Sequence, residues 1–266
     1  GEPAPTASGR VMCFNPQELE AKELAYSVDG DVYYAVNRFA DYGKLAHRCV
    51  EDMSAGARVQ VDERKRHPMD FALWKASKPG EPAWPSPWGE GRPGWHIECS
   101  AMSSKYLGQP FDIHGGGADL IFPHHENEIA QSRCAHPDEI FAKMWMHNGY
   151  LMVEGEKMSK SLGNFITVQD LLKDHHGETI RLAMLKTHYR QPINWTADGL
   201  RQAKAELDGF YGALRRAANV QAEKPKGADA QLQEYWDALG DDLNTPLALK
   251  HLHGRLRQFN RMHSDD

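Results

Sequence analysis

The sequence lacks long apolar runs. No stretch approaches the roughly 20 consecutive apolar residues that a membrane-spanning helix needs, and the first residues lack the basic stretch and apolar core of a signal peptide. Cysteine is also scarce, with four widely separated residues: Cys13, Cys49, Cys99 and Cys134. This spacing predicts reduced thiols rather than a disulfide framework. We therefore expect a cytoplasmic protein with no membrane partner.

Positive charge is not in excess either. The 31 Lys and Arg residues are outnumbered by 37 Asp and Glu residues, which gives a formal net charge of -6. Dedicated nucleic-acid-binding modules are usually basic, so this balance argues mildly against one. An enzyme that acts on RNA can still present local basic patches, and Arg64-Lys65-Arg66 and Arg215-Arg216 are candidates. Each such run is more often simply a solvated face.

Two lysines lie in a short polar loop, Lys157-Met158-Ser159-Lys160-Ser161. The preceding residues alternate apolar and polar around Glu154-Gly155, which predicts a β-hairpin. After the loop, Thr167 and Asp170 have the spacing of a capping box that opens a helix.

Held between these two rigid elements, the ammonium groups of Lys157 and Lys160 can close over a triphosphate. There they would stabilise the charge that develops as pyrophosphate leaves. An isolated Lys-x-x-Lys is usually a solvated turn. The whole pattern, followed by Leu162-Gly163-Asn164, is far more specific.

A second constellation has the composition of a zinc site. It combines Cys99 with Pro123-His124-His125-Glu126-Asn127-Glu128, where Pro123 suits the first position of a helix and His124 and Glu128 share one face. Thiolate, imidazole and carboxylate are all normal zinc ligands, and three of them with one open position describe a catalytic site. Taken alone, His124 would be interpreted as an ordinary histidine at the start of a helix. Cys99 alone would be interpreted as a small buried apolar residue. His125 and Glu126 point elsewhere on that helix and are not the first choices as ligands.

Three glycines, Gly115-Gly116-Gly117, follow an apolar strand end and precede the helix of Pro123. A strand, a glycine turn and a helix form the geometry of a nucleotide site at the carboxyl end of a parallel sheet. The glycines lack the spacing of a dinucleotide-binding fingerprint, so alone they are weak evidence for a nucleotide site. A flexible loop is the alternative. His114 would contact a nucleotide or hydrogen-bond within the loop.

The pattern of breakers and periodicity divides the chain into three regions. A hairpin at Val28–Val36, turning at Asp29-Gly30, and a short strand at 58–62 come first. From Asp70 to about Thr187, strands alternate with helices as in a doubly wound α/β sheet. Helices follow. In the first of these helices, apolar residues recur every three or four positions and so share one face, which predicts packing against the rest of the protein and not a cofactor site. They are Leu200, Ala203, Leu207, Phe210, Leu214 and Ala217.

Taken in order, four segments resemble the cysteinyl-tRNA synthetases. They are Trp95-His96-Ile97-Glu98-Cys99, His114-Gly115-Gly116-Gly117, Phe122-Pro123-His124-His125-Glu126-Asn127-Glu128 and the Lys157–Ser161 loop. The resemblance runs from about Leu24 to about Asn260. It implies a class I synthetase fold: residues 1–23 unmatched, a connective insert at 24–69, the second half of a Rossmann-like parallel sheet at 70–190, and the start of an α-helical bundle at 191–266.

The resemblance also implies an activity and a set of site residues. These enzymes activate L-cysteine with ATP and Mg²⁺ to cysteinyl-adenylate and pass it to tRNA(Cys), with one zinc ion selecting the substrate thiolate over a serine hydroxyl. The implied zinc ligands are Cys99, His124 and Glu128. Trp95 and Asp119 correspond to substrate contacts, and the implied ATP contacts are His114, Gly115, Gly116, Lys157 and Lys160. We expect a monomer.

One departure from the family stands out. Its His-Ile-Gly-His signature, which contacts ATP, and the upstream cysteine that completes the zinc site are absent from this sequence. Cys13 is a weak candidate for the fourth ligand. We therefore expect a chain truncated at both ends with little activity alone. Two alternatives are a ligase that joins cysteine to an amino sugar in mycothiol synthesis and a non-catalytic remnant that binds zinc or RNA.

Overall fold

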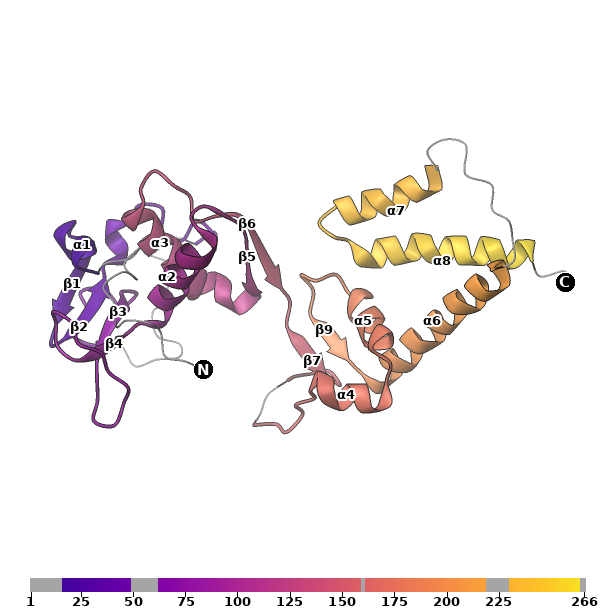
Figure 1. Ribbon diagram of the computed structural model, residues 1–266, viewed down its shortest axis with the longest axis horizontal. Helices are drawn as coiled ribbons and strands as arrows, with labels where there is room; N and C mark the ends of the chain where they lie inside the picture. Colours follow the sequence, from indigo (N-terminus) through magenta and orange to yellow (C-terminus); the bar gives the residue numbers. More distant parts are fainter. Residues whose placement is uncertain (1–15, 49–61, 159–160, 219–229, 264–266) are drawn as a thin grey trace. The chain divides into compact units, whose positions relative to one another are not determined.

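The computed structural model describes residues 16–48, 62–158, 161–218 and 230–263. The chain forms two compact units, Gly1–Met146 and His147–Asp266, and each is described by itself (Figure 1). Among the described residues, no helix has both the length and the apolar character needed to cross a membrane.

The first unit begins with a helix and a four-stranded antiparallel sheet of order β1-β2-β3-β4. The elements are α1 (Pro16–Ala21), β1 (Ala25–Val28), β2 (Asp31–Tyr34), β3 (Phe71–Ala76) and β4 (Gly91–Pro93). The predicted hairpin is confirmed, because Asp29 and Gly30 both have positive φ, at 51° and 82°, as a two-residue turn between twisted strands requires. The strand predicted at 58–62 lies outside the described residues except for Asp62.

The basic residues at 64–66 contact side chains of this sheet and of the segment beside it. Arg64 donates to Asp31 Oδ2 at 2.9 Å and to Asp62 Oδ2 at 2.7 Å. Arg66 lies over the ring of Tyr26, with its guanidinium carbon 4.1 Å from the ring centroid. Lys65 Nζ lies over the ring of Tyr33, 5.8 Å from its centroid, so all three cations in this candidate RNA patch have partners within the fold.

A strand, a helical segment and a second strand complete the first unit and contain the predicted site. The elements are α2 (Trp95–Leu107), β5 (Phe111–Gly117), a 3₁₀ turn at Ala118–Leu120, a wide turn at Ile121–His125, α3 (Glu126–Ala135) and β6 (Ala142–Asn148). β5 pairs with β6. The two strands run parallel, since Phe111 N donates to Phe141 O and Gly115, further along β5, lies against Met146 O. Ile97 of α2 and Ala130 of α3 pack into the core of the antiparallel sheet.

Two local expectations need correction. The three glycines are not a turn, because β5 continues through Gly117 before the chain bends. Regular helix begins at Glu126 rather than at Pro123, since residues 121–125 form a wider turn in which Phe122 has extended backbone angles. His124 therefore belongs to the turn that precedes α3, and Glu128 belongs to its first turn.

The second unit opens with the predicted hairpin, formed by β7 (Leu151–Val153) and β8 (Glu156–Lys157). Its turn residues Glu154 and Gly155 have φ of 49° and 86°. β9 (Ile193–Trp195) pairs in parallel with β7. The capping box is also confirmed, because the Thr167 hydroxyl accepts from Asp170 N at 3.0 Å at the start of α4 (Val168–Asp174).

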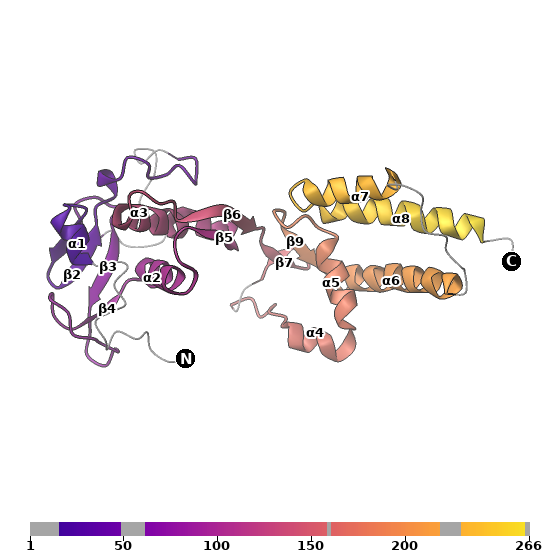
Figure 2. The same ribbon diagram turned by 45° about the horizontal axis from the view of Figure 1, so that its top comes forward.

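Helices make up the rest of the second unit: α5 (Gly177–Leu185), α6 (Ala197–Ala217), α7 (Ala230–Gly240) and α8 (Thr245–Met262). Leu200 and Ala203, on the predicted packing face of α6, are buried. α7 and α8 lie side by side in both ribbon views (Figure 2). The expected α/β and helical regions are thus present. Among the described strands, however, the parallel pairs β5–β6 and β7–β9 belong to separate sheets rather than to one doubly wound sheet.

Candidate functional site

The predicted zinc ligands Cys99, His124 and Glu128 come together in the first unit. One ligand atom from each residue lies within 4.8 Å of the others. Glu128 is completely buried, His124 is buried and Cys99 is partly buried. The three side chains come from three elements, α2, the turn before α3, and α3.

A glycine allows α2 to bring Cys99 to this position. A Cβ on Gly94, the residue that precedes α2, would lie only 2.0 Å from Ala72 O of β3. The helix can start here only because the residue has no side chain. Trp95 and Cys99, in the first turns of α2, are placed by this close contact between helix and sheet.

The carboxylate of Glu128 is the centre of the cluster. Its Oε2 lies 2.9 Å from His114 Nε2, 3.6 Å from His124 Nε2 and 3.9 Å from His125 Nε2. Its Oε1 is buried and has no hydrogen-bond partner among the described residues. Buried carboxylate oxygens are normally hydrogen-bonded or bound to a cation. An unsatisfied Oε1 beside a thiol and an imidazole is therefore the arrangement that a zinc ion would complete.

A second donor set shares this carboxylate. His114, His125 and Glu128 also have ligand atoms within 4.8 Å of one another. The sequence favours Cys99, His124 and Glu128 over His125 as ligands, and the resemblance implies a nucleotide contact for His114. The sequence does offer a signal for His125, since Glu128 is three positions further along the chain and that spacing also places side chains on one helix face.

Burial sets the protonation of the cluster. It raises the pKa of the Cys99 thiol to about 11, and the nearby carboxylates of Glu128 and Glu98 add to the shift. It also lowers the pKa of His124, against the opposing charge of Glu128. The imidazole is thus held in the neutral form that binds metals, whereas the thiol must release its proton when a metal binds.

His96 is a member of the site that sequence reasoning missed. Its Nδ1 lies 2.7 Å from Nδ1 of His124, and burial, with the neighbouring His124, lowers its pKa to about 3. Gln131 of α3 donates to the backbone carbonyl of His96 at 2.7 Å. One Nδ1 must donate and the other accept, so the contact orients the His124 ring with Nε2 toward Glu128.

The predicted substrate contact Trp95 lies over the cluster. Its ring stacks on that of His124 with centroids 4.3 Å apart, and 58% of the residue is exposed. The other predicted contact, Asp119, is exposed in the 3₁₀ turn, with its carboxylate beside Gly117. Trp95 therefore joins the cluster directly, and no contact in the described residues links Asp119 to it.

The predicted ATP contacts are only partly described. Gly116 lies against His125, because a Cβ there would be 3.0 Å from His125 Cε1, and Gly115 is exposed. The backbone of Lys157 pairs with Met152 in the hairpin. Lys160 and Cys13 lie outside the described residues.

A LeuRS from Agrobacterium radiobacter K84, solved as a LeuRS–tRNA–LeuAMS ternary complex, matches with a TM-score of 0.54 at 16% identity, covering 69% of this chain and 30% of that chain. A likeness at this identity shows only that the two chains share a fold. A family model described as the tRNA synthetases class I (C) catalytic domain matches residues 11–205, and the DALR domain matches residues 234–266. The chain belongs to this class I (C) tRNA synthetase family.

Several curated relatives carry the name cysteine–tRNA ligase. The protein of Paramagnetospirillum magneticum is 60% identical over 95% of this chain and 54% of its own length. Those of Rhodospirillum rubrum and Alkalilimnicola ehrlichii are 58% and 57% identical, each over 98% of this chain and over 56% and 57% of their own lengths. The chain thus spans about half the length of these relatives.

Proposed function

We propose that this chain takes part in the ATP-dependent ligation of L-cysteine to tRNA(Cys), as the names of its relatives suggest. The observation that carries the proposal is the unsatisfied Oε1 of Glu128 beside Cys99 and His124. A zinc ion bound there would accept the thiolate of cysteine as its fourth ligand. A serine hydroxyl would fill that position poorly, because neutral oxygen is a weaker zinc ligand than sulfur.

The residues of this chain would hold and orient the amino acid. Cys99, His124 and Glu128 fix the position of the thiol, and Trp95 supplies an aromatic wall that stacks on His124. The carboxylate of the bound cysteine then attacks the α-phosphorus of ATP, held with Mg²⁺, and pyrophosphate leaves. A ribose hydroxyl at the 3′ end of tRNA attacks the resulting cysteinyl-adenylate and releases AMP. Lys157 and Lys160 are proposed to stabilise the departing pyrophosphate.

Calorimetric titration tests the first step. The metal-free chain should bind one zinc ion, and the zinc-loaded chain should then bind cysteine but not serine. Glu128→Gln, which keeps the size of the side chain, should weaken zinc binding by at least about 10-fold and abolish the cysteine signal. Glu139→Gln, at an exposed position of the same unit, is the control. Equal binding of serine and cysteine, or unchanged zinc binding in Glu128→Gln, would refute the proposal.

The amino-sugar ligase and the non-catalytic remnant remain alternatives, and two assays separate them. Cysteine-dependent exchange of pyrophosphate into ATP reports adenylate formation, which the remnant cannot carry out. Transfer of labelled cysteine to a tRNA(Cys) transcript or to an amino sugar identifies the acceptor. A monomeric state stays a prediction for sedimentation analysis.

A further inference from the structure

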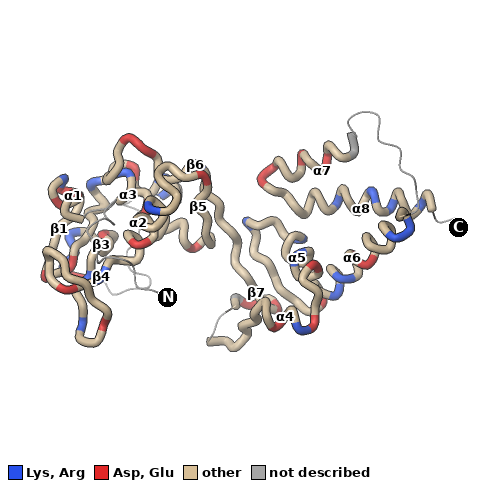
Figure 3. Tube along the Cα trace, viewed as in Figure 1, with Lys and Arg blue, Asp and Glu red and all other residues tan. Residues whose placement is uncertain are grey.

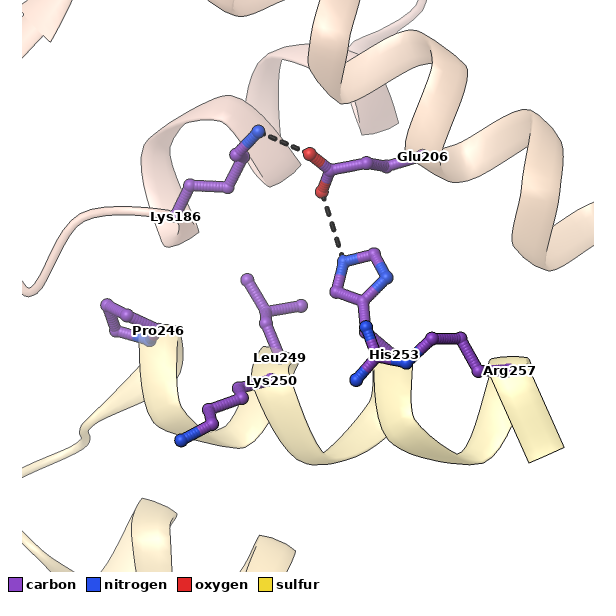
Figure 4. Close-up of a pocket in the computed structure, with 7 residues that line it drawn as sticks. All are labelled: Lys186, Glu206, Pro246, Leu249, Lys250, His253 and Arg257. Carbon is purple, nitrogen blue, oxygen red and sulfur yellow. Dashed lines mark hydrogen bonds and ion pairs between the residues drawn. The ribbon is translucent and has the colours of Figure 1, made fainter.

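Glu126 is a buried carboxylate that the proposed reaction does not use. It lies in the first turn of α3, which contains both acidic residues of this helix (Figure 3), and only 1% of it is exposed. A buried carboxylate is costly unless it is paired. In a pocket of the second unit, for comparison, Glu206 accepts from Lys186 and lies 3.2 Å from His253 Nε2 (Figure 4). No such cation pairs with Glu126 among the residues that the structure describes.

Backbone N–H groups of a loop far away in the sequence satisfy this carboxylate instead. The loop comprises residues 39–48 and follows β2 by a short 3₁₀ turn. Gly43 N donates to Oε2 of Glu126 at 3.0 Å, and Ala46 N donates to Oε1 at 2.8 Å. Gly43 adopts a φ of 95°, which glycine tolerates and other residues do not. Two N–H groups that converge in this way form a binding site for an anion, so the 39–48 loop and Glu126 fit each other.

Side chains add to the contact between the 39–48 loop and the start of α3. The hydroxyl of Tyr42 donates to Oδ1 of Asn127 at 2.5 Å, and both residues are buried. The ring of Tyr42 also packs edge-on against Phe122, with centroids 6.4 Å apart. The loop therefore holds both the first turn of α3 and the turn that precedes this helix.

The predicted metal ligands of these elements lie on the same two segments. His124 belongs to the turn before α3, and Glu128 follows Glu126 by two positions in the first turn of the helix. Residues two apart on a helix do not face the same way. One side of the turn is therefore held by the 39–48 loop, while Glu128 directs its carboxylate to the other side, where Oε2 lies 3.6 Å from His124 Nε2.

We propose that Glu126 is a positioning residue of the zinc site, which acts by fixing the first turn of α3 to the 39–48 loop. The inference rests on the proposed function, because it takes the cluster to bind zinc. Glu126 does not bind the metal. It keeps Glu128 and His124 in place before the metal arrives, so that less ordering accompanies binding. Coupling of this kind is reciprocal, and zinc held by Glu128 should in turn stabilise the hydrogen bonds of the loop.

Competition with a chelator measures the effect on zinc affinity. Glu126→Gln should lower it by about 10-fold or more, because glutamine has the same size but can accept from only one of the two N–H groups. Tyr42→Phe removes one hydrogen bond from the loop side and should lower the affinity about twofold to tenfold, which keeps the test valid if Glu126→Gln does not fold. Arg133→Gln is the matched control. Arg133 donates to Asp41 of the same loop at 2.7 Å, but from the last turn of α3, so its loss should change the affinity by less than about twofold.

Hydrogen exchange separates positioning from a general loss of stability. In the unaltered chain, zinc should slow exchange of the Gly43 and Ala46 amides, whereas in Glu126→Gln exchange should be fast with and without zinc. If Glu126 only stabilises the fold, Glu126→Gln unfolds at lower urea but keeps the zinc affinity of the unaltered chain, and that result overturns the inference. So does an exchange rate at the two amides that zinc leaves unchanged.

Failure of this inference is distinguishable from failure of the proposed function. An unaltered chain that binds no zinc would refute both. Normal zinc binding by the unaltered chain, with equal affinity in Glu126→Gln, Tyr42→Phe and Arg133→Gln, would refute the positioning role alone.

Discussion

His96 and His124 face each other through their Nδ1 atoms at 2.7 Å. His96 is itself fixed, since its ring packs edge-on against Phe71, with centroids 5.3 Å apart, and Gln131 holds its backbone carbonyl. A histidine that binds metal through one nitrogen is usually oriented by a partner at the other. His96 occupies that place for His124.

His96→Phe should therefore weaken zinc binding without removing a ligand. Phenylalanine keeps the ring contact with Phe71 but cannot hydrogen-bond to His124. We expect the affinity for zinc, measured by competition with a chelator, to fall by about 10- to 100-fold. His263→Phe, at the exposed end of α8, should leave it unchanged. Full affinity in His96→Phe would show that the ring of His124 needs no partner.

Substitution by alanine should lower the free energy of unfolding more at Gly116 than at Gly115. A Cβ at Gly116 would lie 2.9 Å from Leu120 Cδ1 and 3.0 Å from the His125 ring, whereas at Gly115 the nearest atom would be Met146 O at 3.4 Å. Overpacking of this kind typically costs about 1–3 kcal/mol. Gly116→Ala should lower the free energy of unfolding by that amount in urea titrations.

Gly115→Ala is the internal control and should change the free energy of unfolding by less than about 0.5 kcal/mol. Equal losses in the two variants would mean that the backbone conformation of β5, rather than the space beside His125, requires the glycines.

Asp242 should make the second unit sensitive to acid. Arg190 donates to both of its oxygens, at 2.5 and 3.0 Å, and Tyr189 donates at 2.6 Å. These hydrogen bonds, that of Arg190 first, lower the pKa of the carboxyl to about 2. A depressed folded pKa adds stability above the unfolded value of about 3.9, and this stability is lost as the pH falls toward 2.

Asp242→Asn should remove that part of the pH dependence. Asparagine tolerates the positive φ of 52° at this position. The thermal midpoint of the variant should fall less steeply between pH 4 and pH 2 (roughly the window between the two pKa values) than that of the unaltered chain or of an Asp241→Asn control. Parallel curves for all three proteins would contradict the assignment to Asp242.

Local signals in the sequence predicted local structure well. Asp29-Gly30 and Glu154-Gly155 specify their hairpins because tight turns need residues that adopt positive φ. Thr167 caps α4 by accepting a hydrogen bond from the backbone N–H of Asp170, three positions further along. None of these features depends on distant parts of the chain. The same signals failed at Pro123, because Phe122 has extended backbone angles and the regular helix begins only at Glu126.

Contacts between elements were harder to predict. The types and spacing of Cys99, His124 and Glu128 indicated a shared site, and the structure brings them together. The contact of His96 with His124 joins residues 28 positions apart and arises only when α2 packs beside α3. Likewise His114 approaches Glu128 because β5 runs beside the start of α3, which no periodicity in the sequence encodes.

X-ray absorption at the zinc edge tests the central claim most directly. The claim is that Cys99, His124 and Glu128 hold a zinc ion with a position open to the thiolate of cysteine. The zinc-loaded chain should show one more sulfur neighbour, at about 2.3 Å, after cysteine is added, and no change after serine is added. A sulfur count that cysteine leaves unchanged would contradict the account.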